Sequence, residues 1–296
     1  MTASRTTDRP VVVGVDGSAT ARSAARWAAR DAALLRSEIE MIASANLSAD
    51  DPHVLEQHGI DPLRTRCERA LAETRRVVED STDAPEPLKI TTRVVDDAPI
   101  TALLEASEHA RMLVLGNRGH MAGHRVALGS VTTAVAEHCR CPLTVVRDSA
   151  SRWPRASVVV GTDGSPGGRR AVDAAFAAAA VREVPVTVVH AWCDTEVVDM
   201  SVPCTMSEWP SHRGRAGAWL DDELAGVRRV YPQVAVRHAV TRDRPARALL
   251  DHAQAAQLLV VGARGRGGFA DLRLGSTTLA VLRAARCPVM VVPHDR

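Results

Sequence analysis

The sequence has few aromatic residues and no long apolar run. Aromatic side chains make up 3% of the 296 residues, so Val, Leu, Ile and Ala must form the core. That mixture is typical of buried parallel strands covered by alanine-rich helices. No apolar run approaches the roughly 20 residues that cross a bilayer, and the polar N-terminus does not resemble a signal peptide. We therefore expect a cytoplasmic protein with no membrane partner.

The sequence also lacks an excess of charge of either sign. It contains 37 basic and 35 acidic residues, which gives a net charge of +2. Binding to nucleic acids and to anionic membranes depends strongly on clustered positive charge. The composition therefore gives no reason to expect a nucleic-acid partner.

None of the six cysteines forms a CxxC pair. Cys139 and Cys141 flank one residue before an apolar segment, and Cys287 has the matching place late in the chain. We expect buried thiols, with a metal site or a regulatory disulfide as the alternatives. The histidines, which include His190, have no metal-ligand spacing, and there is no Ser-His-Asp order or nucleophile elbow.

What the sequence does contain is an internal repeat. VVVGVDGS at 11–18 recurs as VVVGTDGS at 158–165, and LVLGNRG at 113–119 recurs as LVVGARG at 259–265. The tripeptide LGS and a closing Cys-Pro segment also recur, in the same order and at nearly the same displacement. We therefore expect a tandem duplication, with domains over 1–148 and 149–296.

Each copy alternates apolar runs with amphipathic, alanine-rich segments. Strands alternating with helices imply right-handed crossovers and a parallel sheet. Five apolar runs in each copy predict an α/β fold with two tandem five-stranded parallel sheets and helices on both faces. The strands expected are 11–16, 39–44, 89–95, 112–116 and 142–146, then 157–162, 185–191, 234–240, 258–262 and 288–292.

The most specific motif is Gly-x2-Gly-x9-Gly-Ser, which occurs once in each copy. It runs from the end of the fourth strand to the start of a helix. Glycines allow close backbone approach, and a helix N-terminus offers free N–H groups to an anion. One such motif could be an ordinary turn, but two with identical spacing favour phosphate binding. The motif lacks the Gly-Lys-Ser/Thr ending of a Walker A loop and does not follow the first strand as a dinucleotide fingerprint does.

Two aspartates, Asp16 and Asp163, are predicted to end the first strand of each copy. The carboxyl ends of strands border the binding crevice in a doubly wound sheet, so aspartate and glycine loop can face one ligand. The carboxylate would bind ribose hydroxyls or Mg²⁺, or would instead cap the following helix, a role that Ser18 and Ser165 can also fill. Arg118 and Arg264 lie within the loops and can pair with phosphate.

The VVVGVDGS start, the Gly-x2-Gly-x9-Gly-Ser loop and the CPLTVV end together resemble the universal stress protein family, in particular its tandem, ATP-binding members from actinobacteria. The resemblance covers nearly the whole chain. It implies a sheet of order 3-2-1-4-5 in each domain, with adenine near the ends of the first two strands and the phosphates on the glycine loop. It also implies pairing through the last strands, 142–146 and 288–292, either between the two halves of one chain or between chains, together with a homodimer and unidentified protein partners.

The resemblance further implies two sets of ATP-binding residues. The first site would contain Gly14, Val15, Asp16, Ser44, Gly116, Gly119, Gly129, Ser130, Val131 and Thr132. The second would contain Gly161, Thr162, Asp163, Ala191, Gly262, Arg264, Gly265, Gly275, Ser276, Thr277 and Thr278. Bulky His120 and Met121 in the first loop make the second site the more conventional one.

The sequence favours a binding protein over an enzyme. ATP hydrolysis needs a positioned water and usually an orienting group or base, and no base is identifiable beside the expected γ-phosphate. We expect an ATP-binding stress-response or regulatory protein that binds one nucleotide per domain together with Mg²⁺, with at most slow hydrolysis. The alternative is an enzyme of a related adenine-nucleotide fold, an ATPase or nucleotidyl transferase, and an empty structural protein is a third possibility.

Overall fold

The protein was analysed as a computed structural model that describes residues 9–47, 60–81, 87–119, 127–147, 156–192, 209–266 and 273–294. The chain divides into two compact units, Met1–Ser151 and Arg152–Arg296.

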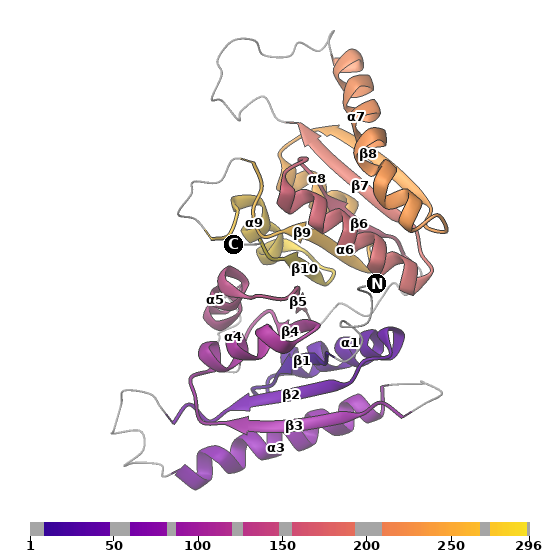
Figure 1. Ribbon diagram of the computed structural model, residues 1–296. Helices are drawn as coiled ribbons and strands as arrows, with labels where there is room; N and C mark the ends of the chain where they lie inside the picture. Colours follow the sequence, from indigo (N-terminus) through magenta and orange to yellow (C-terminus); the bar gives the residue numbers. More distant parts are fainter. Residues whose placement is uncertain are drawn as a thin grey trace. The chain divides into compact units, whose positions relative to one another are not determined.

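The first unit contains five parallel strands in the order β3-β2-β1-β4-β5 (Figure 1). The strands are β1 (Val11–Gly14), β2 (Ile39–Ser44), β3 (Ile90–Val95), β4 (Met112–Gly116) and β5 (Leu143–Val146). The helices are α1 (Ala19–Leu35), α3 (Ile60–Glu79), α4 (Pro99–His109) and α5 (Ser130–His138).

The second unit repeats this topology with the order β8-β7-β6-β9-β10. Its strands are β6 (Val158–Gly161), β7 (Val186–Trp192), β8 (Val236–Arg242), β9 (Leu258–Gly262) and β10 (Val289–Val292). Its helices are α6 (Pro166–Arg182), α7 (Trp209–Val230), α8 (Pro245–His252) and α9 (Ser276–Ala284). The predicted α/β fold and the strand order 3-2-1-4-5 are confirmed in each unit.

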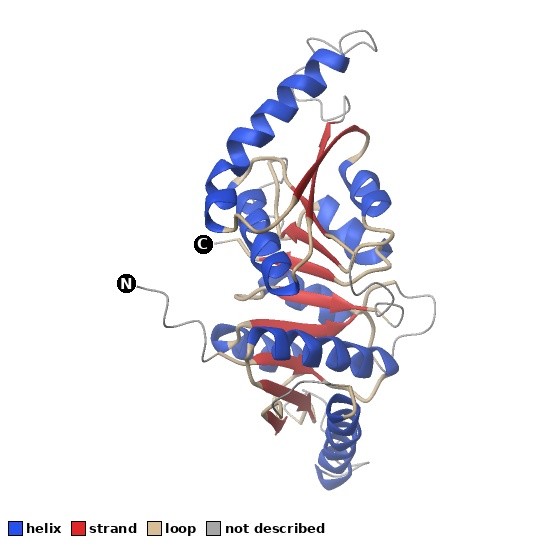
Figure 2. Cartoon of the chain, turned by 90° about the vertical axis from the view of Figure 1, so that its right-hand side faces the viewer, coloured by secondary structure: helices blue, strands red, loops and turns tan. Residues whose placement is uncertain are grey.

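Helices cover both faces of the sheet in each unit (Figure 2). In the first unit α1 packs beside α3, and α4 packs beside α5. The second unit pairs α6 with α7 and α8 with α9 in the same way. Across the described ranges, no helix combines the length and apolarity needed to span a bilayer.

Aliphatic strands and alanine-rich helices form the core, as the scarcity of aromatic residues predicts. Val11, Val13 and Val158 are fully buried, and so are Ala24 and Ala28 on the face of α1 that meets the sheet. Small alanine side chains let the helix backbone approach the strands closely, and the packed interior leaves few voids.

Serine side chains define where α1 and α6 begin. The Ala21 N–H donates to Ser18 Oγ at 3.1 Å, and the Gly168 N–H donates to Ser165 Oγ at 3.1 Å. Each hydroxyl therefore satisfies a first-turn donor that has no partner within the helix. Of the two capping alternatives, serine rather than aspartate provides the cap.

The first strand of each unit ends earlier than the sequence predicted. β1 and β6 end at Gly14 and Gly161, so Asp16 and Asp163 lie in the following turn instead of ending the strand. The turn contains Gly164, whose φ of +75° is in the left-handed region that glycine adopts most readily. Val15 follows β1 and is still buried, so the apolar run in the sequence continues past the end of that strand.

Phe176 gives a test of core packing in the second unit. It is fully buried on α6, so Phe176→Ala should remove about 3–5 kcal/mol from the free energy of unfolding by leaving a cavity. Urea denaturation followed by circular dichroism measures the loss. Leu34→Ala is the control, because Leu34 is 49% exposed and its truncation should change the midpoint little. Equal effects of the two substitutions would contradict the packing assigned to Phe176.

Candidate nucleotide-binding site

Each glycine loop connects the fourth strand of its unit to a short helix. The Gly129 N–H donates to the Asn117 carbonyl at 2.8 Å, and the Gly275 N–H donates to the Ala263 carbonyl at 2.8 Å. The two ends of each loop are therefore joined by the same hydrogen bond in both units. Residues 120–126 and 267–272, which include His120 and Met121, lie outside the described residues.

The helices that follow these loops have no side-chain cap. Their N-cap residues are Gly129 and Gly275, and no side-chain hydrogen bond caps either helix, in contrast to α1 and α6. Ser130 and Ser276 are the first helical residues and are exposed, so neither occupies the N-cap position. First-turn N–H groups of an uncapped helix can bind an anion.

Thr132 and Thr278 link α5 and α9 to the ends of β4 and β9 through side-chain hydrogen bonds. The Thr132 hydroxyl donates to the Gly116 carbonyl at 3.0 Å, and the Thr278 hydroxyl donates to the Gly262 carbonyl at 2.7 Å. Both side chains are buried, so any contact with a ligand would involve the backbone N–H. The neighbouring Val131 and Thr277, also predicted site residues, are partly exposed in the first turn.

The turn aspartates lie against the glycine loops. Asp163 Oδ1 accepts the Ser165 N–H at 2.9 Å, and its Oδ2 accepts the Arg266 N–H at 2.7 Å. A Cβ added to Gly265 would lie 2.5 Å from Asp163 Oδ2, and one added to Gly119 would lie 2.9 Å from Asp16 Oδ2. The structure thus brings aspartate and loop together in both units, and explains why the second loop position is glycine.

Hydrogen bonding keeps the Asp163 carboxylate ionised. Burial acts to raise its pKa, but hydrogen bonds from the Ser165 hydroxyl and from the N–H groups of Ser165 and Arg266 outweigh burial, so the pKa is lowered. The group is therefore an anion at neutral pH, in the form that can accept hydroxyl hydrogen bonds or bind a cation.

The first glycine of each loop lies against the first helix of its unit. A Cβ on Gly116 would be 2.8 Å from the backbone carbon of Thr20, and a Cβ on Gly262 would be 2.8 Å from the Gly167 carbonyl oxygen. Thr20 Oγ1 also donates to the Arg118 carbonyl at 2.5 Å. Glycine at these positions is therefore a packing requirement, independent of any ligand.

Sequence reasoning missed one arginine beside the first loop. Arg147 follows β5, and its guanidinium donates to the Ala127 carbonyl at 3.2 Å. Burial and the nearby charge of Arg118 both lower the pKa of Arg147. Two cations thus lie at the first loop, whereas the second has Arg264 and Arg266 within the loop itself. The sequence pattern does not single out Arg147, because this residue lies outside every repeated motif.

The residues predicted at the ends of the second strands have different surroundings. Ser44 ends β2, and its hydroxyl donates to the Asp97 carbonyl at 2.6 Å. Ala191 lies near the end of β7, next to His190, whose Nδ1 donates to the Thr162 carbonyl at 2.9 Å. Val15 and Thr162 are buried beside them, so in each unit the first two strand ends form one surface next to the loop.

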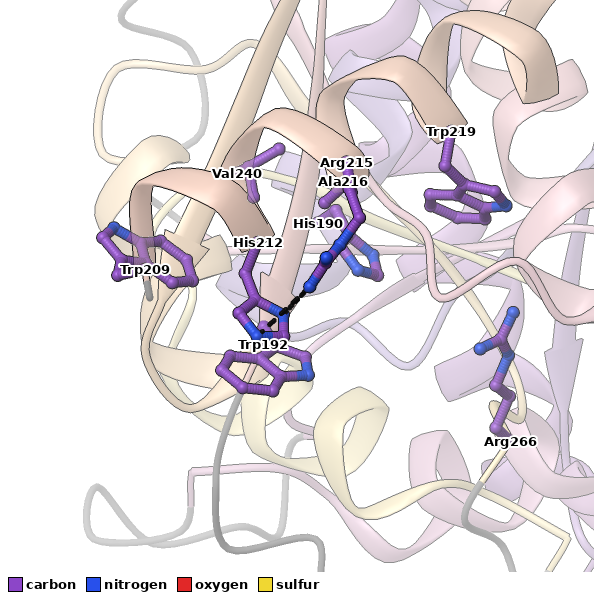
Figure 3. Close-up of a pocket in the computed structure, with 9 residues that line it drawn as sticks. All are labelled: His190, Trp192, Trp209, His212, Arg215, Ala216, Trp219, Val240 and Arg266. Carbon is purple, nitrogen blue, oxygen red and sulfur yellow. Dashed lines mark hydrogen bonds between the residues drawn. The ribbon is translucent and has the colours of Figure 1, made fainter. Parts of the chain in front are cut away.

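A cavity of about 350 Å³ opens beside these strand ends in the second unit (Figure 3). Its lining includes His190 and Trp192 of β7, Trp219 of α7, and Arg266 of the glycine loop. The helix residues were missed because periodicity alone assigns a tryptophan on a helix to the core.

The described cysteines are buried thiols, namely Cys67, Cys139, Cys141 and Cys287. Cys139 and Cys141 have their sulfur atoms 3.8 Å apart and share a hydrogen bond. Within the part of the chain that the structure describes, no three His, Cys, Asp or Glu residues gather as metal ligands.

Comparison with known proteins agrees with this architecture. The pattern of the Universal stress protein family matches residues 8–147 and again residues 155–293. The chain belongs to the universal stress protein family. Two matches in succession also establish its tandem organisation.

Mycobacterial relatives match this chain over nearly the whole length of both proteins. The chain is 34% identical over 290 residues to the universal stress protein Rv2623 of Mycobacterium tuberculosis, covering 95% of each. It is 35% identical over 292 residues to a universal stress protein of Mycolicibacterium smegmatis, covering 97% of each. A crystal structure of a universal stress protein from Archaeoglobus fulgidus aligns with a TM-score of 0.70 at 18% identity, covering 98% of this chain and 100% of that one, which supports the fold.

The hydrogen bonds of Asp163 predict a pH effect on stability. Because its folded-state pKa is lowered, its contribution is present above the ordinary pKa of about 3.9 and is lost as the pH falls through the folded value. Asp163→Asn should therefore lower the urea midpoint at pH 7. The difference in midpoint between the variant and the parent protein should be smaller at pH 3. Exposed Asp222→Asn is the control for a lost surface charge. A gap of equal size at both pH values would contradict the lowered pKa.

Proposed function

We propose that this universal stress protein binds ATP, one molecule in each unit, and acts as a nucleotide-dependent regulator. The observation that carries the proposal is the repeated combination of a glycine loop, an uncapped helix N-terminus and a turn aspartate. The phosphates would lie against the loop amides and the first-turn N–H groups of α5 and α9. Asp16 and Asp163 would accept hydrogen bonds from the ribose hydroxyls.

The donor set is compatible with Mg²⁺ held mainly by the nucleotide. Mg²⁺ at nucleotide sites is commonly bound by one or two carboxylates together with phosphate oxygens. Asp16 and Asp163 each supply one carboxylate at the loop, and the lowered pKa of Asp163 keeps it charged. The ion would neutralise phosphate charge, and the arginines of the loops would add to that neutralisation.

Binding rather than catalysis fits the side chains around the loops. A hydrolase needs a group that orients or deprotonates the attacking water. In the second unit His190 is bonded to the Thr162 carbonyl, and Asp163 is bonded to backbone N–H groups. We therefore propose slow hydrolysis at most, with ATP shifting the arrangement of the loop and the surface offered to a partner.

Homodimerisation and protein partners belong to the same proposal. A nucleotide-dependent regulator must present a surface that differs between its nucleotide-bound and nucleotide-free forms. Light scattering with and without ATP would measure the mass of the assembly, and a monomer under both conditions would remove the dimer from the proposal.

The direct test is to identify nucleotide in the protein purified from cells. Denaturation should release adenine nucleotide, and calorimetry of the emptied protein should give two ATP per chain. No released nucleotide and no calorimetric binding would overturn the proposal. Rapid multiple turnover in a phosphate-release assay would favour the enzyme alternative instead.

Aspartate substitutions at the helix caps separate binding from folding. Gly129→Asp and Gly275→Asp should each abolish one of the two ATP sites, because a carboxylate at the N-cap takes the first-turn N–H groups and repels phosphate. Both caps have extended backbone, and a Cβ would have no neighbour closer than 3.5 Å. The same carboxylate should stabilise each helix by roughly a few tenths of a kcal/mol relative to glycine, so loss of binding cannot be ascribed to unfolding.

Gly226→Asp is the matched control for these variants. Gly226 lies on α7, and a Cβ there would meet no atom within 4 Å. It adds the same charge away from both loops, so the stoichiometry should stay at two. Unchanged ATP binding by the double variant Gly129→Asp/Gly275→Asp would place the phosphates elsewhere.

A further inference from the structure

The first unit contains a buried group of sulfur and hydroxyl atoms where α4, α5 and β5 meet. The Sγ atoms of Cys139 and Cys141 lie 3.8 Å apart. The N–H of Arg140, the residue between them, donates to Ser107 Oγ at 3.1 Å. Cys139 is 9% exposed, Cys141 5% and Ser107 1%. Two thiols and a hydroxyl therefore share one interior position, at the end of α5 that lies away from the glycine loop.

The second unit has only one of these two thiols. The closing Cys-Pro segments align Cys141 with Cys287, so that Cys139 corresponds to Ala285. Cys139 and Ala285 end their helices with nearly the same backbone, at φ −58° and ψ 139° against φ −61° and ψ 141°. Alanine thus fits the same turn, and the fold does not require a thiol at Cys139.

The hydroxyl of the group is also absent from the second unit. The same alignment places the buried Ala253 where the first unit has Ser107. A buried hydroxyl is costly unless it is hydrogen-bonded. The Ser107 hydroxyl donates to the Leu104 carbonyl at 2.6 Å and accepts the Arg140 N–H. Because an apolar side chain serves at this position in the duplicate, the polar group of the first unit has a purpose other than packing.

The two thiols differ in acidity. The hydrogen bond from the Cys141 thiol lowers the pKa of Cys139 against the effect of burial, and a bond from the Ser107 hydroxyl adds to the lowering. The hydrogen bond with Cys139, together with burial, raises the pKa of Cys141. The thiolate is the nucleophilic form of cysteine. Cys139, which is also the more exposed of the two, is therefore the attacking thiol, and Cys141 stays protonated beside it.

We propose that Cys139 and Cys141 are a peroxide-reactive thiol pair that forms a disulfide within the first unit. Their sulfur atoms are close to van der Waals contact and must approach by about 1.8 Å to reach the bond length of about 2.0 Å. One residue separates the cysteines, so the movement is confined to the turn between α5 and β5. The inference does not depend on ATP binding, because the phosphates would lie at the opposite end of α5.

The reaction balances with one hydrogen peroxide per disulfide. The Cys139 thiolate attacks a peroxide oxygen, the O–O bond breaks, and the leaving hydroxide takes a proton to become water, which leaves a sulfenic acid on Cys139. The Cys141 sulfur then attacks this sulfur. The S–S bond forms, the S–O bond breaks, and the second hydroxide leaves as water with the Cys141 proton. The two sulfur atoms lose two electrons, and the peroxide is reduced to two waters.

The test treats the whole protein with hydrogen peroxide, denatures it, blocks the remaining thiols with N-ethylmaleimide and maps the peptides by mass spectrometry. The segment 139–141 should be lighter by two hydrogen atoms and carry no maleimide, and dithiothreitol should restore both thiols. Trypsin cleaves after Arg140. The reduced protein therefore gives two separate peptides here, whereas the disulfide holds their cysteines together.

Cys139→Ala is the decisive variant, because Ala285 shows that alanine fits this backbone. The substitution should abolish the disulfide and leave the Cys141 thiol free to react with maleimide after denaturation. Cys287→Ala is the matched control. It removes the buried thiol that corresponds to Cys141 in the second unit, and the yield of the 139–141 disulfide should be unchanged.

Cys141→Ala tests which thiol reacts with peroxide. Without the second thiol, oxidation should stop at a sulfenic acid on Cys139, which dimedone traps. Cys139→Ala should give no dimedone adduct on Cys141. Recovery of Cys139 and Cys141 as maleimide adducts after excess peroxide would overturn the proposal. So would a disulfide that joins either residue to another cysteine of the chain instead.

Discussion

A side chain cannot be accommodated at the carboxyl end of β4 or β9, and the arrangement of each site depends on this constraint. The added Cβ of Gly116 or Gly262 would come within 2.8 Å of the backbone at the start of α1 or α6. That close approach joins the fourth strand to the first helix. It also brings the glycine loop beside the turn aspartate, because the first and fourth strands are neighbours in each sheet. The parallel topology thus creates the crevice, and the two glycines determine how tightly it closes.

Duplication has conserved the loop framework and changed its surroundings. The hydrogen bond between the ends of the loop, the threonine bond to the strand carbonyl and the uncapped helix occur in both units. Around this framework, the first unit has Arg147 beside its loop and alanines at the strand ends. The second has arginines within the loop and aromatic residues at the strand ends. Two copies of one phosphate-type loop are therefore combined with two different environments for the rest of a ligand.

In both units the groups gathered at the glycine loop stabilise negative charge. Loop amides, helix N-termini and arginines all stabilise negative charge, and their effects add in one crevice. Asp163 accepts the Arg266 N–H of the second loop, and its hydrogen bonds lower its pKa. A carboxylate in that state is a weak base and a good hydrogen-bond acceptor. The geometry therefore leaves Asp163 as a charged hydrogen-bond acceptor beside the second loop.

The sequence by itself determined the duplication, the α/β class and the pairing of glycine loop with helix, because these features follow from periodicity and from residues that repeat. It also placed most strands within two residues of their observed ends. Only the tertiary structure decided which residue caps each helix, since Ser18 and Asp16 are equally able to do so in the sequence. It alone brought Arg147 to the first loop, and Trp219 and His212 to the strand ends of the second unit. Those residues come from separate elements, and local patterns do not record which distant elements pack together.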